Sequence, residues 1–184
     1  MNPIPKFDHN NVLPPHLGDP REPGDLSPYE CTSLEICERF ATSSDRIIIL
    51  KGLINFRLRM VQEGILQGFQ WLDGSFLENI ELIESRSPRD LDIVTFYGGL
   101  TIEFQENLLI SFPEFIYTNL AKRNYMLDHY PVDYCISPDL TVENTRYWIQ
   151  LFSHNRLGVW KGIIRLQLNT PNDDKEALNY LSGL

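Results

Sequence analysis

The stretch WLDGSFLENIELIESRSPRDLDIVTF, residues 71–96, joins a Gly-Ser corner to a pair of aspartates inside a later apolar segment. A spacer of fourteen residues separates Ser75 from Asp90, and Asp92 follows two positions later. Aspartate is disfavoured in β-strands, and its burial is unfavourable unless the carboxylate is paired or binds a metal. We therefore expect a divalent cation to account for the two aspartates of DLDIVTF.

The spacing of the two aspartates predicts that their carboxylates share one face of a strand. Side chains alternate along an extended chain, so Asp90 and Asp92 project to the same side about 6.5 to 7 Å apart. At that separation they can share one or two hard cations such as Mg²⁺ or Mn²⁺, which take oxygen ligands. A paired-metal site of this kind can bind nucleotide phosphates and stabilise both oxygens of an in-line displacement.

The Gly-Ser corner supplies a complementary phosphate site. Gly74 permits close approach of the backbone, and a helix that begins after it would offer free N–H groups beside the Ser75 hydroxyl. Lys122 and Arg123 end the helix expected before the next strand, so they are candidates for contacts with a triphosphate. The alternative for these two cations is a solvated face or an ion pair.

Asp133, in the apolar segment PVDYCIS, is the candidate third carboxylate. An aspartate in a short apolar strand again needs a partner, which a shared metal would provide. The alternative is an aspartate at the end of a strand that caps a turn.

The remaining pattern alternates helical and extended segments. Helices are expected at residues 33–40, 46–64, 113–126, 141–154 and 173–181, a helix or helical turn at 76–83, and strands at 68–75, 90–97, 131–137 and, as a strand or extended segment, 159–168. Ser43 or Ser44 is expected to cap the long helix and Gly64 to end it. In the helix at 141–154, Thr141 is expected as the cap, with a buried stripe of Val142, Trp148, Ile149 and Phe152.

The N-terminal segment is rich in proline. Seven of the twelve prolines fall within the first 28 residues, which excludes a long helix or a central strand there. Apolar residues such as Ile4, Val12 and Leu13 indicate that the segment packs rather than moves freely. We therefore expect an irregular arm at 1–30 that packs on a single domain at 31–184.

Composition narrows the function classes. A net charge of −9 argues against general binding of duplex DNA, because phosphate binding depends on Lys and Arg. No apolar run reaches the roughly 18 to 20 residues of a membrane span, and the N-terminus lacks the features of a secretory signal. Three cysteines fit neither a disulfide framework nor a zinc module. We expect a cytoplasmic protein without membrane association.

The segments LDGSF, RDLDIV and VDYCI follow one another along the chain, each in or at the end of an expected strand. In this order they resemble the motifs of the nucleotidyltransferase superfamily. Its members carry a Gly-Gly or Gly-Ser pair, then Asp-x-Asp on one strand and a further Asp on a later strand. The chain is more closely similar to a group of small bacterial members with a Leu-Pro-Pro arm, here IPKFDHNNVLPPHLG. These also end in an aromatic helix and a Lys-Gly-Ile-x-Arg-Leu strand, here YWIQLFSHNRLGVWKGIIRLQL.

The resemblance implies an α/β (α+β) fold, a mixed sheet flanked by helices. It implies transfer of a nucleoside monophosphate from an NTP to a protein, RNA or small-molecule acceptor. Asp90, Asp92 and Asp133 would hold Mg²⁺ or Mn²⁺, with Asp133 as a possible base, while Gly74 and Ser75 steady the terminal phosphates. Small relatives often occur with a cognate partner protein in toxin–antitoxin or phage-defence pairs. The alternative is an inactive module of the same fold, antitoxin-like or regulatory, that binds a partner protein.

Overall fold

The computed structural model describes residues 3–184 and contains a five-stranded mixed sheet in the order β1-β5-β2-β3-β4. The strands are β1 (Tyr29–Glu30), β2 (Gly68–Asp73), β3 (Leu91–Tyr97), β4 (Leu127–Asp133) and β5 (Ile164–Gln167). β2 is antiparallel to both β3 and β5, whereas β3 with β4 and β1 with β5 are parallel pairs. The expected mixed sheet with flanking helices is confirmed.

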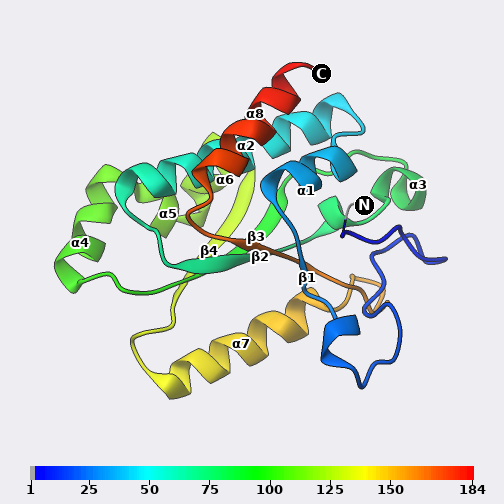
Figure 1. Ribbon diagram of the computed structural model, residues 1–184, viewed down its shortest axis with the longest axis horizontal. Helices are drawn as coiled ribbons and strands as arrows, with labels where there is room; N and C mark the ends of the chain where they lie inside the picture. Colours follow the sequence, from blue (N-terminus) through cyan, green and yellow to red (C-terminus); the bar gives the residue numbers. More distant parts are fainter. Residues whose placement is uncertain (1–2) are drawn as a thin grey trace.

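Helices cover the two faces of this sheet unequally. They are α1 (Ser33–Phe40), α2 (Ser44–Glu63), α3 (Ile80–Glu84), α4 (Ile102–Ser111), α5 (Pro113–Ile116), α6 (Thr118–Tyr125), α7 (Pro138–Phe152) and α8 (Pro171–Ser182), with 3₁₀ turns η1 (Pro23–Asp25) and η2 (Ser75–Leu77). Figure 1 shows α1, α2, α6 and α8 on one side of the sheet and α7, with the short turn η1 near its end, on the other. Among residues 3–184, no helix is both long and apolar enough to cross a membrane.

Helix α2 is the central element of the larger layer, and its ends follow local signals. The Ser43 side chain accepts a hydrogen bond from the Arg46 N–H, and Gly64 ends the helix with φ 87°. A left-handed residue at this position satisfies the last carbonyls of a helix at little cost when it is glycine. The expected cap and stop are confirmed, and the helix buries Leu50 and Leu53 in the main core.

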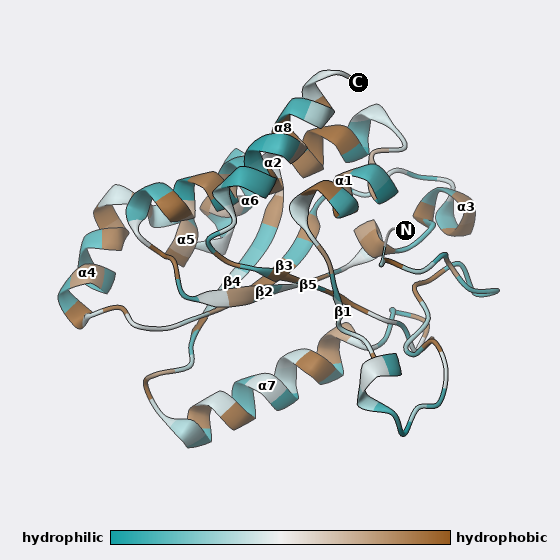
Figure 2. Cartoon of the chain, viewed as in Figure 1, coloured by the Kyte–Doolittle hydropathy of each residue, from teal (hydrophilic) through white to brown (hydrophobic). Residues whose placement is uncertain are grey.

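Helix α7 forms the smaller layer and differs from its expected form. Ser137, not Thr141, is the N-cap, because the helix begins at Pro138. Trp148 and Phe152 pack in a second apolar cluster on the sheet, as expected. Val142, however, is 65% exposed, so its predicted burial is wrong. Ile149 is exposed as well. Figure 2 shows hydrophobic bands alternating with hydrophilic ones along α7.

Strand β4 begins four residues earlier than the segment 131–137 predicted from the sequence. Pro131 cannot donate a backbone hydrogen bond, so it is disfavoured inside a central strand. β4 lies at the edge of the sheet, where proline is tolerated within a strand. Residues 134–137 form a turn, and α4 was not expected at all. The helix predicted at 113–126 is two helices, α5 and α6.

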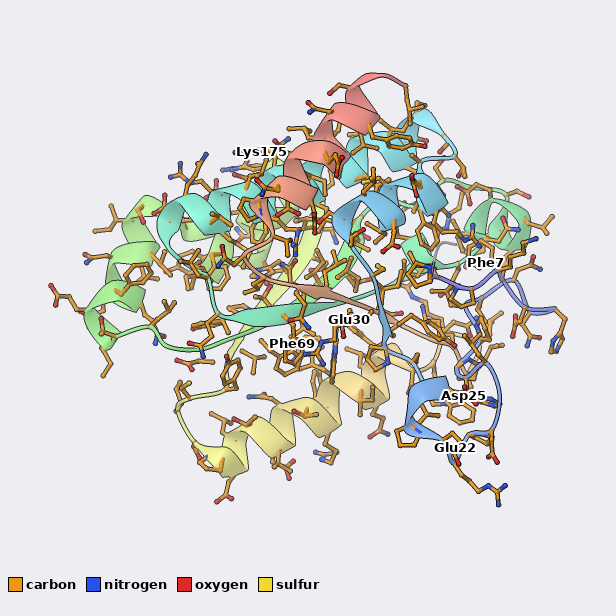
Figure 3. All side chains as sticks on the ribbon, in the orientation of Figure 1. Phe7, Glu22, Asp25, Glu30, Phe69 and Lys175 are labelled. Carbon is orange, nitrogen blue, oxygen red and sulfur yellow. The ribbon has the colours of Figure 1, made fainter. Side chains whose placement is uncertain are left out.

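The proline-rich segment lies against the domain. Val12 and Leu13 are fully buried, and the Gly162 N–H donates to the Leu13 carbonyl at 2.7 Å. The Phe7 ring lies 6.1 Å from that of Phe40 at the end of α1. Figure 3 labels Phe7 within the N-terminal segment. The last two residues of the segment form β1 and so belong to the sheet.

A chain of buried polar groups links α8, α2 and three strands. The Arg57 guanidinium donates to Asp174 and to the side chain of Gln70, both at 2.7 Å. Gln70 donates to Thr95 at 3.0 Å, and Thr95 is hydrogen bonded to His129 at 2.8 Å. The Arg57–Asp174 pair is almost completely buried. Removing one member of such a pair is strongly destabilising because it leaves the other charge uncompensated.

Candidate functional site

The strand register places three aspartates in one row across the sheet. Asp73, the last residue of β2, is paired with Asp92 on β3, and Asp92 is paired with Asp128 on β4. Cross-strand neighbours project from the same face with Cβ atoms about 4.5 to 5.5 Å apart. Asp90 lies two residues before Asp92 and so belongs to the same face. Four carboxylates therefore gather at one end of the sheet, on its α7 side.

These carboxylates line an open cleft of about 280 Å³. Gly74, Ser75 and Glu78 lie beside them, while α3 and the end of α7 contribute to the lining. The full lining is Asp73, Gly74, Ser75, Glu78, Ile80, Ile83, Glu84, Arg86, Asp90, Asp92, Lys122, Asp128, Leu151, Phe152, Asn155, Arg156, Leu157 and Lys161. The proline-rich arm contributes none of these residues. The cleft thus combines an acidic centre with apolar and cationic walls.

Burial and repulsion by neighbouring carboxylates disfavour the ionised forms of Asp73 and Asp92. Burial raises the pKa of Asp92 to about 6, and the neighbouring Asp90 and Asp128 carboxylates add to the effect. Burial also raises the pKa of Asp73 to about 7, against the opposing influence of Lys161. Desolvation and like charges both disfavour the ionised form. A bound cation would relieve both penalties.

Lys122, near the end of α6, contacts two carboxylates of the row. Its Nζ lies 2.7 Å from Asp90 Oδ2 and 3.4 Å from Asp128 Oδ2. The hydrogen bond to Asp90 raises the pKa of Lys122. Its side chain is 52% exposed, so the ammonium can leave the carboxylates without unfolding the core.

Lys161 is a second cation, buried at the base of the cleft. Its Nζ lies 3.0 Å from Asp73 Oδ1, and it donates to Glu78 Oε1 at 2.7 Å and to the Gly74 carbonyl at 3.1 Å. The side chain is only 2% exposed. The three contacts tie the end of β2 to the turn that follows it.

Gly74 cannot be replaced without disturbing the row. Its φ is 85°, and a Cβ at this position would lie 1.9 Å from Asp92 Oδ2. The backbone is therefore packed directly against the carboxylate, which only glycine allows. After Gly74 the chain forms the 3₁₀ turn η2 and then the short helix α3, so the helix or helical turn expected at 76–83 is divided into two pieces. Ser75 lies in the cleft lining.

Asp133 does not join the other carboxylates, so the expected trio is corrected. It pairs with Tyr97 at the far end of β4, about 17 Å from the Asp92 row at the usual rise per residue. It also projects to the opposite face from Asp128, because five residues separate the two. Asp133 accepts hydrogen bonds from the Gln105 side chain at 2.9 Å and the Cys135 N–H at 2.8 Å.

Asp128 is the residue that the sequence reasoning missed. The alternation of apolar and polar residues in Leu127-Asp128-His129-Tyr130 is the strand signal that could have found it. Arg123 is also placed differently from expectation: it is exposed, donates to Asn124 Oδ1 at 3.2 Å and does not line the cleft. Lys122 does line it.

The donor set fits a hard divalent cation by its chemistry. Asp90, Asp92 and Asp128 offer only oxygen ligands and carry more negative charge than Lys122 balances. Within residues 3–184, no group of three acidic, histidine or cysteine side chains is already placed as a metal cage. The Lys122 ammonium holds two of the three carboxylates, so binding of a metal requires its displacement.

Comparison with known families gives one match, to the family described as "Family of unknown function (DUF6932)", over residues 5–167. Searches of curated proteins and of solved structures found no match. The matched region includes every residue of the cleft described above and most of the chain. The chain therefore belongs to the DUF6932 family.

Proposed function

We propose that this protein is a divalent-cation-dependent nucleotidyltransferase that transfers a nucleoside monophosphate from an NTP to an acceptor hydroxyl. The main support is the alignment of Asp73, Asp92 and Asp128 on adjacent strands, beside Gly74 and Ser75, in an open cleft. A triphosphate is strongly anionic, so a site for it needs cations. The raised pKa of Asp92 is consistent with a carboxylate cluster that gains from a bound cation.

In this proposal, Asp90, Asp92 and Asp128 hold Mg²⁺ or Mn²⁺. The metal supplies neutralisation of the triphosphate and of the charge that develops on the attacking and leaving oxygens. Asp128 takes the place that the sequence suggested for Asp133. Lys122, once released from Asp90 and Asp128, contacts the phosphates as a cation.

The reaction needs one proton transfer and one displacement. Asp128 accepts the proton of the acceptor hydroxyl, whose oxygen then forms a bond to the α-phosphorus. The bond from that phosphorus to the bridging oxygen breaks, and pyrophosphate leaves with the electron pair. The Ser75 hydroxyl and the amides of its turn bind the terminal phosphates, which holds the triphosphate in line.

The walls of the cleft suit the rest of a nucleotide and an acceptor. Leu151 and Leu157 offer apolar surface on one side, and Ile83 offers it on the other. Arg156 also lines the cleft, and no ion pair holds it within residues 3–184. An acceptor that carries phosphate or carboxylate groups would find a free cation there. Protein, RNA and small-molecule acceptors all remain within this proposal.

Label transfer tests the proposal directly. The protein is incubated with α-labelled NTPs, Mg²⁺ or Mn²⁺ and a cell extract, and labelled products are separated into protein, RNA and small-molecule fractions. Wild-type protein and the Asp133→Asn variant should transfer label, whereas Asp128→Asn and the double variant Asp90→Asn with Asp92→Asn should not. Transfer that survives the double substitution, or no transfer with any of the four NTPs, contradicts the proposal.

A second candidate is a non-catalytic module that binds a partner protein. It is favoured by the exposed apolar residues of α7, among them Leu140, Tyr147 and Leu151, and by the Lys122 contacts that already neutralise part of the carboxylate row. A pull-down tests it together with a thermal-shift measurement. Stoichiometric capture of one partner, with no stabilisation by any NTP and Mg²⁺, supports the module over the enzyme.

A further inference from the structure

The turn after β2 is held by two buried cations that arrive from different parts of the chain. Lys161, which precedes β5, donates to the Gly74 carbonyl at 3.1 Å. Arg46, in the first turn of α2, donates to the Phe76 carbonyl at 2.6 Å and to the Glu78 carbonyl at 2.8 Å. Three carbonyls of a five-residue segment are therefore fixed by side chains that are themselves buried.

Of these two buried cations, Lys161 is the one that holds the carbonyl of the Gly74–Ser75 peptide. Besides the Gly74 carbonyl, it contacts Asp73 and Glu78, which lie on either side of the Gly74–Ser75 peptide. The ammonium donates hydrogen bonds to the Gly74 carbonyl and to Glu78, and it forms an ion pair with Asp73. A buried ammonium is tolerated only when it is paired and hydrogen bonded, so the ion cluster and the turn depend on each other.

The orientation of the Gly74–Ser75 peptide follows from this contact. In a trans peptide the N–H points opposite to the C=O, so a carbonyl held by Lys161 turns the Ser75 N–H away from that lysine. The Ser75 N–H has no hydrogen-bond acceptor among residues 3–184, whereas the N–H groups of Leu77 and Glu78 donate to carbonyls within the turn. Ser75 itself lines the cleft.

We propose that Lys161 is a positioning residue that orients the Ser75 amide and hydroxyl toward the terminal phosphates of the bound triphosphate. This inference rests on the proposed nucleotidyltransferase function. Lys161 contacts no reacting atom in it: the lysine acts through the turn, and its charge is neutralised by Asp73 and Glu78. Loss of the lysine frees the peptide to rotate, so the turn no longer presents its N–H group in a fixed direction.

Binding of tripolyphosphate in the presence of Mg²⁺ tests the inference without depending on a base or an acceptor. The test variant is Lys161→Met with Glu78→Gln, which removes one positive and one negative charge from the buried cluster. Isothermal titration should show that Kd for tripolyphosphate rises about tenfold or more, the loss expected for a charge-assisted hydrogen bond. The thermal shift with MgCl₂ alone should remain that of the wild type, because Asp90, Asp92 and Asp128 are unchanged.

A matched control separates positioning from general destabilisation. The double variant Arg57→Met with Asp174→Asn also removes the charges of a buried ion pair, but it touches neither the turn nor the cleft. It should keep the wild-type Kd. The Ser75 amide resonance should shift on addition of tripolyphosphate in the wild type and in this control, and not in the Lys161 variant.

The outcomes distinguish this inference from the proposed function. If the wild type does not bind tripolyphosphate with Mg²⁺, the proposed function and the inference both fail. If the wild type binds it and the folded Lys161 variant binds equally well, only the inference fails. Should circular dichroism show that the double variant is unfolded, Lys161→Arg is measured instead. It keeps the charge but replaces three radial N–H bonds by a planar group, and an unchanged Kd in that variant equally overturns the inference.

Discussion

Replacing Asp92 by asparagine should stabilise the metal-free protein, although most substitutions in a folded core destabilise. Burial, assisted by Asp90 and Asp128, raises the pKa of Asp92 from 3.8 to about 6. The ionised carboxylate is thus less favourable in the folded protein than in the unfolded chain. The associated stability is present below pH 4, declines as the pH rises through about 6, and is lost at neutral pH.

The magnitude follows from the size of this shift. The rise of the Asp92 pKa from 3.8 to about 6 corresponds to roughly 3 kcal/mol of unfavourable interaction at neutral pH. An amide in place of the carboxylate removes that repulsion, and poorer hydrogen bonding by the amide takes back roughly 1 kcal/mol. We therefore expect Asp92→Asn to raise the free energy of unfolding by about 2 kcal/mol at pH 7.5 in a chelator. The gain should disappear near pH 4.

Urea denaturation measures this effect, and the addition of Mg²⁺ gives its counterpart. A ligand that binds only the folded state stabilises it by RT ln(1 + [L]/Kd), so Mg²⁺ should raise the midpoint of the wild type. Asp92→Asn should lose most of that response. The variant is therefore expected to be more stable than the wild type without metal. Addition of Mg²⁺ should reduce or reverse this difference.

Asp133→Asn is the matched control, an aspartate on β4 that points away from the cleft. It loses acceptor strength toward Gln105 and the Cys135 N–H, so it should be destabilised by about 1 kcal/mol and keep the full response to Mg²⁺. If Asp92→Asn proves less stable than the wild type in the chelator at pH 7.5, the carboxylate row is not under electrostatic strain. An undiminished Mg²⁺ response in that variant would refute the metal assignment.

Three further outcomes are expected. In Gly74→Ala the new Cβ would meet a carboxylate, so the free energy of unfolding should fall by about 2 kcal/mol or more. Gly158→Ala has a similar φ in open space, so it should lower the free energy of unfolding by about 1 kcal/mol. Thermal unfolding of the two variants measures the difference. Asp174→Asn leaves Arg57 buried without its counter-ion and should cost about 3 to 5 kcal/mol in urea denaturation, more than the double variant with Arg57→Met. Burial raises the pKa of Cys37 to about 12, so stability is complete below pH 9 and falls above it by up to about 1.4 kcal/mol per pH unit. Denaturation at pH 8, 9 and 10 should show a steeper loss for the wild type than for Cys37→Ser, and equal slopes would contradict the assignment.

Elements with strong local signals were predictable from the sequence. The cap at Ser43 and the stop at Gly64 define α2 because a cap acts on the two or three residues next to it. The strands that carry Asp73 and Asp92 were recognised from apolar runs and a glycine corner. The mixed sheet was expected only from the resemblance to a known superfamily, not from these local signals. These signals all act over a few residues, so folding elsewhere in the chain did not alter them.

The edge position of β4 was not predictable, and it decided which aspartate joins the row. Pro131 reads as a strand boundary unless the strand lies at the edge of a sheet, which is a property of the whole sheet. With Pro131 inside the strand, Asp128 pairs with Asp92 and Asp133 falls at the other end. A strand alternates its side chains with a period of two, so the five-residue interval also placed them on opposite faces.

The buried cation of the cleft was equally beyond local reasoning. Lys161 and Gly74 are 87 residues apart, and nothing near either residue indicates that they meet. The local sequence around Lys161 does not indicate that its side chain is buried. Its burial follows from β5 pairing with β2, which brings the segment before β5 beside the end of β2.

The sequence by itself determined α1, α2, α7 and α8, three of the strands, the Gly74–Ser75 corner and the Asp90–Asp92 pair, because each depends on neighbours within a turn or two of the chain. Only the tertiary structure decided that Asp128 and Asp73 complete the row, that Lys122 bridges it and that Lys161 fixes the turn. Those contacts join segments that are far apart in sequence. They depend on strand order and register, which are set by burying the apolar faces of the whole sheet rather than by any local pattern.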